Sequence, residues 1–361
     1  MPDFERVNKS APKKRKKKKK ESVFTSIYRG LIPCKGDSKG DVIRKIVFLA
    51  AIVILAYALI SIIYFYTIRA NEINNEMTRL QELKQQNHTD DVISVVLNDD
   101  DDNSSNGGEV QILSEYLPFY EQNNDFVGWV SMYPYIDYPV VQTTDNDFYL
   151  KHNFYKNPTD NGTIFADYEG IISADSMPGN TILYGHNLIT RNYFEPLTEY
   201  QRQGISFLKE NYIIDFDTLY QRGKYVIFSV FLCNTDEQHG EVFDYQNDVY
   251  FKTKAEFNDF VAECLDRSMF YTGVDLQYGD QLLTLSTCNF SMFKDMRLVV
   301  VARKLRTDES LILDTETFID NTGYDENGNV KRKMFEAFYE TYNCQWAGRN
   351  WDTSWIKDYE G

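Results

Sequence analysis

The chain has 361 residues, and 38 Lys and Arg side chains against 54 Asp and Glu give it a formal net charge of −16. Residues 1–45 hold 15 basic and 5 acidic side chains, whereas the rest of the chain holds 23 basic and 49 acidic ones. The acidic bulk excludes a nucleic-acid-binding surface, which needs clustered Lys and Arg, and the 43% hydrophobic content excludes global disorder. We therefore expect separate compartments and no nucleic-acid partner.

The two charge regions are separated by Ile46–Ile68, a run of 23 residues without a charge, Pro or Gly. A helix of that length extends roughly 34 Å, which is enough to cross the apolar core of a bilayer. The alternatives are a buried core helix, which rarely runs so long without a polar position, and a cleaved signal peptide, which needs a shorter run and a small-residue cleavage site. The run predicts a membrane anchor in contact with lipid.

Charges beside the apolar run predict its orientation. Arg44 and Lys45 precede it directly, and the basic run Lys13–Lys20 lies upstream, whereas the sequence after Arg69 turns acidic. The positive-inside rule then places the N-terminus in the cytoplasm and the remainder outside the cell. A basic run can also be a nuclear localisation signal, but beside an anchor, contact with anionic lipid headgroups is the simpler explanation.

Composition divides the part after the anchor. Asn71–Gln86 is polar with a weak helical period and indicates a short stalk, and Asp90–Gly108 is too acidic and too poor in apolar residues to fold, which indicates a flexible linker. We expect the folded domain to start near Val110. The expected segments are a cytoplasmic basic segment (1–45), an anchor (46–68), a stalk and linker (69–109), a catalytic domain (110–306) and a C-terminal extension (307–361).

Short apolar runs separated by turn residues dominate the predicted domain. Many of these runs are β-branched or aromatic, and their spacing favours a mainly antiparallel barrel or sandwich. The expected strands are Phe126–Val130, Tyr138–Val141, Gly162–Ala166, Asn180–Tyr184, Ile213–Asp217, Lys224–Leu232, Gln281–Ser286 and Leu298–Lys304. The expected helices are Leu113–Asn123, Phe194–Tyr200 and Lys254–Arg267. The fold class is therefore mixed, with β structure dominant.

The five cysteines are Cys34, Cys233, Cys264, Cys288 and Cys344. The sequence has no CxxC pair, and four histidines give no zinc-binding spacing, so we expect no metal and no cofactor. An extracellular domain could hold two disulfides, but Cys264 lies at an apolar position of an expected helix, where a buried thiol is the common outcome. We expect Cys233, Cys264 and Cys344 to be unpaired.

Cys288 differs because it ends the expected strand GDQLLTLSTC, beside a loop. Arg297 opens the next strand, so a hairpin would return it to the side of Cys288. A guanidinium there can stabilise a thiolate and donate hydrogen bonds to an oxyanion. His186 follows the strand NTILYG, and an imidazole near a thiol can stabilise the thiolate and protonate a leaving amine. Each residue alone is more often structural; the three together indicate a catalytic site.

The motif TLSTC, the Arg that follows it and LYGH upstream resemble the sortases of Gram-positive bacteria. The Ser in TLSTC is typical of class B, and the segments NNDFVGWV, IDYPVVQTTDNDFYL, GTIFADY and IIDFDTLY extend the similarity over about Leu113–Leu305. The resemblance implies a membrane-anchored cysteine transpeptidase with an eight-stranded β-barrel, N-terminal helices and one long inserted helix.

The resemblance also implies a role for each site residue. Cys288 would attack the Thr carbonyl of a sorting signal, His186 would protonate the departing amine, and Arg297 would position the substrate and stabilise the oxyanion. Asn146, Leu150, Thr235 and Ser286 match positions that line the sorting-signal groove. The sequence departs from the family pattern in two places. The loop Leu232–Tyr250, which bears on the preferred signal, carries His239 where an aromatic is expected, and Asn289 follows the cysteine where an acidic residue is common.

The implied partners are secreted proteins with a C-terminal sorting signal and an amine of the cell-wall precursor. The alternatives are a pilus-polymerising enzyme that uses a pilin lysine, a secreted cysteine protease and a non-catalytic membrane-anchored binding module. The extension 307–361 is rich in aromatic residues and contains the amphipathic pattern KMFEAFYETY. We expect it to pack on the barrel; regulation of the groove or docking of a partner is the alternative.

Overall fold

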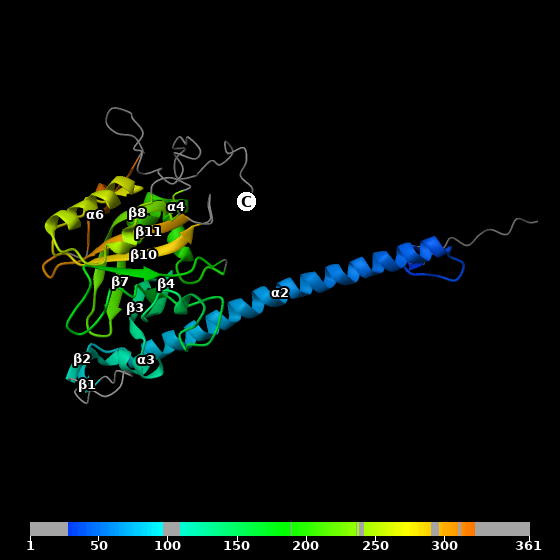
Figure 1. Cartoon of the computed structure of the whole chain (residues 1–361), viewed down its shortest axis with the longest axis horizontal. Helices are drawn as coiled ribbons and strands as arrows, with labels where there is room; N and C mark the ends of the chain where they lie inside the picture. The colour runs from blue at the N-terminus through cyan, green and yellow to red at the C-terminus, as the bar shows by residue number, and fades with distance from the viewer. Residues whose placement is uncertain are drawn as a thin grey trace, which may run out of the picture. The chain divides into compact units, whose positions relative to one another are not determined.

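The computed structural model describes residues 28–96, 109–188, 190–235, 237, 242–289, 296–309 and 312–321. The basic run Lys13–Lys20, His239, Cys344 and the pattern KMFEAFYETY lie outside these ranges. The chain divides into two compact units, Met1–Asn71 and Glu72–Gly361, and helix α2 (Lys39–Asn87) contributes to both (Figure 1). Each unit is described by itself.

The first unit contains the apolar part of α2. A stretch of the helix over Lys39–Tyr64 has a mean hydropathy of 3.0 and is not buried, so its length and composition allow it to cross a membrane. Ser38 caps the helix, because its Oγ accepts a hydrogen bond from the Asp41 amide at 3.2 Å. The Lys45 ammonium binds back to Asp37 at 2.7 Å, which fixes the turn before the helix.

The second unit begins with the last turns of α2 and not at Val110. Ile73, Met77 and Leu80 are buried on one side of the helix at the i, i+4, i+7 spacing, whereas the sequence indicated a free stalk. The expected linker also differs, since β1 (Val92–Val96) pairs antiparallel with β2 (Glu109–Leu113). The apolar period of the stalk was weak, but it was enough to bury three side chains.

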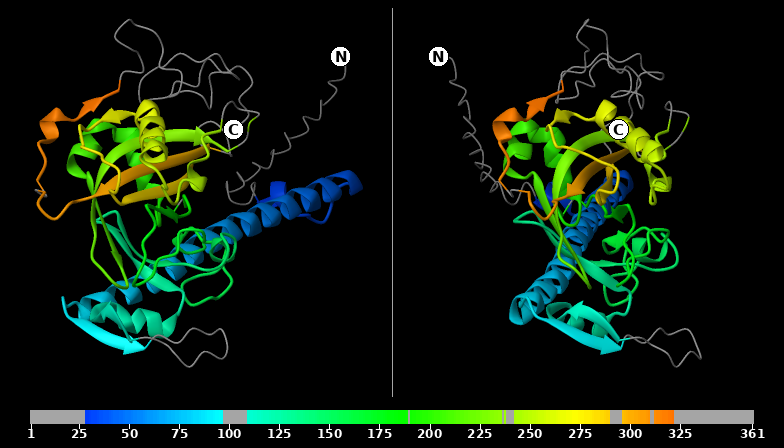
Figure 2. Two further views of the ribbon diagram at one scale, coloured as in Figure 1. Left: turned by 60° about the vertical axis from the view of Figure 1, so that its left-hand side comes forward. Right: turned by 90° about the vertical axis from the view of Figure 1, so that its left-hand side faces the viewer.

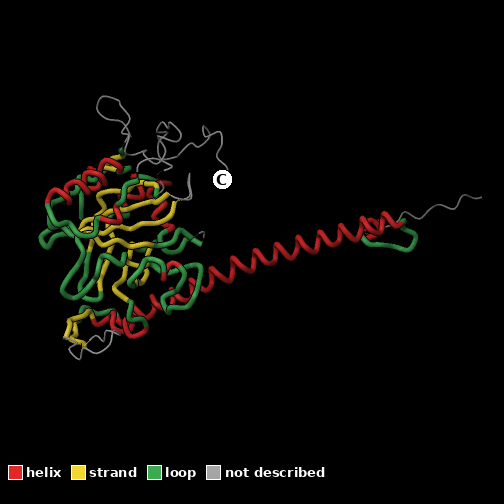
Figure 3. Tube along the Cα trace, in the orientation of Figure 1, coloured by secondary structure: helices red, strands yellow, loops and turns green. Residues whose placement is uncertain are grey.

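Eight strands form a closed barrel in the order β10-β11-β8-β7-β3-β4-β5-β6 (Figures 1 and 3). Their bounds are β3 (Phe126–Met132), β4 (Ile136–Val141), β5 (Phe165–Ala166), β6 (Asn180–Tyr184), β7 (Ile213–Thr218), β8 (Lys224–Asn234), β10 (Leu282–Asn289) and β11 (Met296–Lys304). Each overlaps one of the eight expected strands, so the β-barrel fold is confirmed. Most pairs are antiparallel, but β6 pairs parallel with β10, and β4 with β5.

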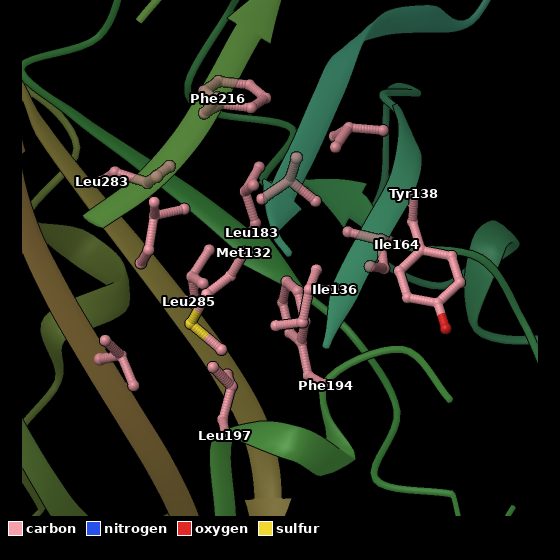
Figure 4. Packing of buried hydrophobic residues seen from close by; sticks show 14 of the residues in the cluster. Met132, Ile136, Tyr138, Ile164, Leu183, Phe194, Leu197, Phe216, Leu283 and Leu285 are labelled. Atoms are coloured by element: carbon pink, nitrogen blue, oxygen red, sulfur yellow. The ribbon is translucent and has the colours of Figure 1, made fainter. Parts of the chain in front are cut away.

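The barrel interior is filled by side chains from nearly every strand and from the loops that close its ends. Figure 4 shows Met132, Leu183, Leu283 and Leu285 meeting there with Phe194, which comes from the segment after β6. Closure removes exposed strand edges, and the interior of an eight-stranded barrel is just wide enough for side chains to fill. The interior is therefore a packed core.

Helix α6 (Lys254–Arg267) has the bounds that the sequence predicted and packs on the outside of the barrel against β8 (Figure 2). Thr253 caps it by accepting a hydrogen bond from the Glu256 amide at 3.2 Å. Because both faces of β8 are covered, every residue of the strand after Lys224 is buried. This explains why β8 is a nearly continuous apolar run without polar alternation.

The remaining elements are short. The helix expected over Leu113–Asn123 is a 3-10 turn, η1 (Ser114–Tyr116), followed by α3 (Leu117–Gln122), and the one expected over Phe194–Tyr200 is η3 (Glu195–Leu197) followed by α4 (Thr198–Gln203). The sequence did not predict α5 (Ile205–Glu210) or the pair β9 (Phe270–Tyr271) and β12 (Ile319–Asp320). Further 3-10 turns are η2 (Phe148–Leu150), η5 (Tyr245–Asn247) and η6 (Thr315–Thr317).

The start of the C-terminal extension packs on the folded unit. Phe318 is buried, and β12 pairs antiparallel with β9, next to the end of α6. Asn321 closes this contact, since its side-chain amide donates a hydrogen bond to the Ser268 carbonyl at 2.8 Å. The described part of the extension therefore adds a short layer beside α6.

Candidate active site

The parallel pair β6–β10 brings two distant parts of the chain to one end of the barrel. Ser286 of β10 is the register partner of Tyr184 of β6, and the two strands run in the same direction. The residues that follow, His186 and Cys288, therefore leave the barrel at the same end. Two hydrogen bonds join the strands here, from Thr287 Oγ1 to the Gly185 carbonyl at 2.7 Å and from the Gly185 amide to the Ser286 carbonyl at 3.2 Å.

Cys288 is a free thiol and is partly exposed, whereas Cys233 and Cys264 are free and buried. The Cys288 backbone is held in place by Asn187, whose amide donates a hydrogen bond to the Cys288 carbonyl at 2.8 Å. Of these three thiols, only Cys288 borders open space in which a substrate could meet it. A reactive thiol must be accessible to its substrate, and the fixed backbone holds Cys288 in a defined position.

His186 is oriented by the backbone on the far side of the site. Its Nε2 lies 3.0 Å from the Leu150 carbonyl. A carbonyl oxygen only accepts hydrogen bonds, so in this arrangement the proton is on Nε2, and the lone pair of a neutral ring is on Nδ1. Gly162 allows this close approach: at its φ of +64°, an added Cβ would lie 2.7 Å from the Tyr149 carbonyl and 2.9 Å from His186 Cδ2.

Arg297 lies between two cysteines in the strand register. On one side its partner is Cys288 of β10, and on the other side it is Cys233 of β8. Direct partners in a sheet present their side chains on the same face, so the three residues form a row across the sheet. Burial raises the pKa of Cys233 to about 12, against the effect of the nearby Arg267 and Arg297 guanidiniums. Cys233 is therefore a neutral neighbour of Arg297 at physiological pH.

A cavity of about 220 Å³ contains the three predicted catalytic residues in its lining. Three of the four residues predicted to bind substrate also line it: Asn146, Leu150 and Ser286. Thr235 does not belong to this lining; it follows the last residue of β8 and is exposed. Its role in substrate binding stays a prediction.

The lining includes residues that sequence reasoning missed, namely Phe165, Tyr184, Gly185, Gln246 and Thr287. No local pattern marked Tyr184, because it is placed by its pairing with Ser286, which forms only when the barrel closes. Gln246 belongs to η5, within the loop Leu232–Tyr250. Its neighbour Tyr245 is buried and forms a 2.7 Å hydrogen bond with Ser286 Oγ, which fixes the Ser286 hydroxyl.

Within the described residues, no group of three or more His, Cys, Asp or Glu side chains is arranged to hold a metal ion. The chemistry that the site offers comes from its side chains: a thiol that can act as nucleophile, an imidazole with a free Nδ1, and a guanidinium beside the thiol. A thiol, an imidazole and a cation around one cavity are suited to acyl transfer through a thioester.

Comparison with known proteins identifies the family of the chain. Residues 135–305 match the family model of the sortase domain. The chain is 30% identical to sortase B of Listeria monocytogenes over 186 residues, which are 51% of this chain and 71% of the relative. The protein belongs to the sortase family of transpeptidases, and its relatives place it in class B.

Solved structures share the fold. A Staphylococcus aureus sortase B–substrate complex matches 66% of this chain and 98% of its own, with a TM-score of 0.51 and 24% sequence identity. A sortase B complexed with triglycine matches 66% of this chain and 99% of its own, with a TM-score of 0.52 and 24% identity. At this identity the likeness concerns the barrel fold.

Proposed function

We propose that this protein is a cysteine transpeptidase that cleaves a C-terminal sorting signal and transfers the acyl group to an amine of the cell-wall precursor. The observation that carries the proposal is the cavity in which Cys288, His186 and Arg297 meet from three different segments of the chain. Membership of the sortase family supports the same reaction class.

In the proposed reaction, the Cys288 thiol gives its proton to Nδ1 of His186, and Sγ attacks the threonine carbonyl carbon of the signal, whose oxygen becomes an oxyanion beside Arg297. The peptide C–N bond then breaks, the leaving amine takes a proton from His186, and a thioester remains on Cys288. An incoming amine attacks this thioester and gives up a proton to His186. The C–S bond then breaks, the new amide leaves, and His186 returns the proton to Cys288 Sγ, which restores the thiol. In the net reaction, the peptide amide of the signal is replaced by an amide to the acceptor amine.

The acceptor and the location are parts of the same proposal. One structural neighbour is a sortase B complexed with triglycine, which supports a short glycine chain as an acceptor to test. The apolar stretch of α2 supports a single membrane anchor, with the basic N-terminus in the cytoplasm and the barrel outside the cell. A pilin lysine as acceptor is the alternative, which a lysine-containing peptide offered in place of triglycine would test.

The test is to incubate the protein in detergent with threonine-containing peptides, with and without triglycine, and to analyse protein and products by mass spectrometry. We expect a thioester on Cys288 without triglycine and a triglycine-linked product when it is present. Cys288→Ala should form neither, and Cys233→Ala is the matched control that should form both. Cleavage by Cys288→Ala at the parent rate would refute the mechanism, and hydrolysis without transfer would favour a protease.

A further inference from the structure

A buried carboxylate joins two walls of the cavity. Asp167 follows β5 directly and is only 4% exposed. Its Oδ2 accepts a hydrogen bond from Asn146 Nδ2 at 2.9 Å and another from the Tyr184 hydroxyl at 2.8 Å, and its Oδ1 accepts one from the Glu169 amide at 2.9 Å. Asn146 and Tyr184 both line the cavity beside Cys288, whereas Asp167 does not belong to the lining.

The contacts of Asn146 leave its side-chain amide only one orientation. Its Oδ1 accepts a hydrogen bond from the Tyr168 backbone amide at 3.1 Å, and a backbone N–H can only donate. The carboxylate of Asp167 can only accept, so it requires Nδ2 on its own side. With both ends fixed, one N–H of Asn146 is left for another partner. The cavity therefore has a donor of defined position in this wall.

Tyr184 is fixed by the same carboxylate. Burial, together with the negative charge of Asp167, raises the pKa of Tyr184 well above its usual range, so the hydroxyl stays protonated and donates its hydrogen to Asp167. Only the oxygen lone pairs of Tyr184 remain for a ligand. One carboxylate thus sets a donor at Asn146 and an acceptor at Tyr184.

The backbone of Asp167 is itself anchored. Its amide donates to the Ile182 carbonyl at 2.9 Å, and its carbonyl accepts from Gln142 Nε2 at 2.7 Å and from the Gly170 amide at 3.2 Å. The carboxylate is therefore held at a fixed place between the two cavity residues. Loss of its charge would weaken the hydrogen bond that holds Asn146 Nδ2 and would allow the Tyr184 hydroxyl to rotate.

We propose that Asp167 is a positioning residue that sets which peptides this cavity selects, by fixing the Asn146 amide and the Tyr184 hydroxyl. The ligand class is a peptide with both an acceptor and a donor for this wall, such as a carboxamide side chain or a backbone amide. This inference rests on the proposed peptide-binding function. It predicts an effect on affinity and selectivity and not on the reactivity of Cys288.

The experiment measures binding without chemistry, so that it stays separate from the proposed reaction. The full-length Cys288→Ala protein is immobilised in detergent and exposed to a library of threonine-containing pentapeptides, and the retained peptides are quantified by mass spectrometry. We expect the enrichment of preferred peptides to fall by about 10-fold when Asp167→Asn is added, the effect of losing charge-assisted hydrogen bonds. Glu169→Gln is the matched control: it removes a nearby exposed charge and should leave enrichment unchanged.

A swapped variant separates positioning from folding. Asn146→Asp combined with Asp167→Asn keeps one donor and one acceptor between the two side chains, so thermal stability should return toward that of the parent. The donor now belongs to residue 167, so enrichment should stay low. Recovered enrichment in the swap, unchanged enrichment in Asp167→Asn, or no enrichment by the Cys288→Ala parent would each overturn the proposal.

Discussion

Cys288 of β10 and Arg297 of β11 are direct partners in the antiparallel register. Their side chains therefore leave the same face of the sheet, with Cβ atoms roughly 5 Å apart. The two strands build this pairing from backbone hydrogen bonds, so both side chains line one cavity before any substrate binds. The Arg297 guanidinium donates a hydrogen bond to the Met296 carbonyl at 3.1 Å. Such preorganisation is what makes a cation effective at an oxyanion.

Arg297→Lys keeps the charge at this register position but removes the planar fork of donors. We expect kcat for peptide cleavage to fall about 100-fold, as when one oxyanion-hole donor is removed, with little change in Tm. Steady-state kinetics and thermal unfolding measure the two effects. Arg306→Lys, beyond the far end of β11, is the matched control with parent kinetics. A kcat for Arg297→Lys equal to that of the parent would contradict a role at the oxyanion.

Gly162→Ala tests how closely the backbone supports His186. The new Cβ would lie 2.9 Å from His186 Cδ2 and from the Leu150 carbonyl, so we expect the imidazole to move and kcat to fall by about 10-fold or more. Gly273→Ala is the matched control, because Gly273 also has a positive φ, of +68°, but an added Cβ would have no neighbour within 4 Å.

Gly273→Ala should lose about 1 kcal/mol of folding free energy, the usual cost of a left-handed conformation for a residue with a side chain. Gly162→Ala should lose more, because its Cβ also meets the Tyr149 and Leu150 carbonyls. Only Gly162→Ala should lose catalytic rate in addition. Urea unfolding and initial rates give the two quantities. Equal rates in the two variants would show that the backbone at Gly162 does not control His186.

Cys233 predicts a pH dependence of stability. Its pKa is about 12 in the folded protein, above the ordinary value of 9.0, so between these values the unfolded chain loses the proton while the folded chain keeps it. The folded state binds more protons, and its stability must fall as the pH rises through this window, by up to about 1.4 kcal/mol per pH unit.

Removal of the Cys233 thiol should reduce the loss of stability with rising pH. We expect the free energy of unfolding of Cys233→Ala to decrease less than that of the parent between about pH 9 and pH 10.5, as measured by urea titration at several pH values. The buried Cys264 and tyrosines titrate in both proteins, so they cancel in the comparison. Parallel curves would mean that Cys233 ionises alike in the folded and unfolded chains.

Leu80→Ala tests whether the end of α2 belongs to the folded unit. Leu80 is fully buried, and truncation of such a side chain to Ala typically costs about 2–5 kcal/mol. Thr78→Ala, on the exposed side of the same turn, is the control and should change stability by less than about 0.5 kcal/mol. Thermal unfolding of the two variants in detergent measures the difference. Equal Tm values would show that the end of α2 is a stalk that does not pack on the folded unit.

The barrel could be predicted from sequence because its strands are strongly apolar and are separated by clear turn residues. The segment around Asn180–Tyr184 is one example, and α6 is another, since Thr253 caps it and its apolar residues keep a helical period. The pairing of Cys288 with Arg297 followed from hairpin geometry alone. The role proposed for His186 rests largely on the family resemblance, because little in the local sequence distinguishes it from a structural histidine.

The parts that were missed depend on contacts between distant segments. Ile73 and Met77 are buried because they pack against the folded unit, and no local pattern predicts that contact. The strand Val92–Val96 forms because it pairs with Glu109–Leu113, which is separated from it in the sequence by an acidic segment. Tyr184 was assigned to a strand, but its place in the cavity follows from closure of the barrel. Local propensity carries no information on such contacts.

The parallel pairing of β6 with β10 has a consequence for the order in which the site can form. Gly185 and Thr287, which are hydrogen-bonded to each other, are 102 residues apart in the chain. In the proposed topology, a chain that leaves the membrane from its N-terminal anchor presents the His186 segment long before the Cys288 and Arg297 strands. In that topology the Cys288 and His186 segments would come together only after the last barrel strands have been exported and docked, so a passing peptide could not acylate an incompletely exported chain.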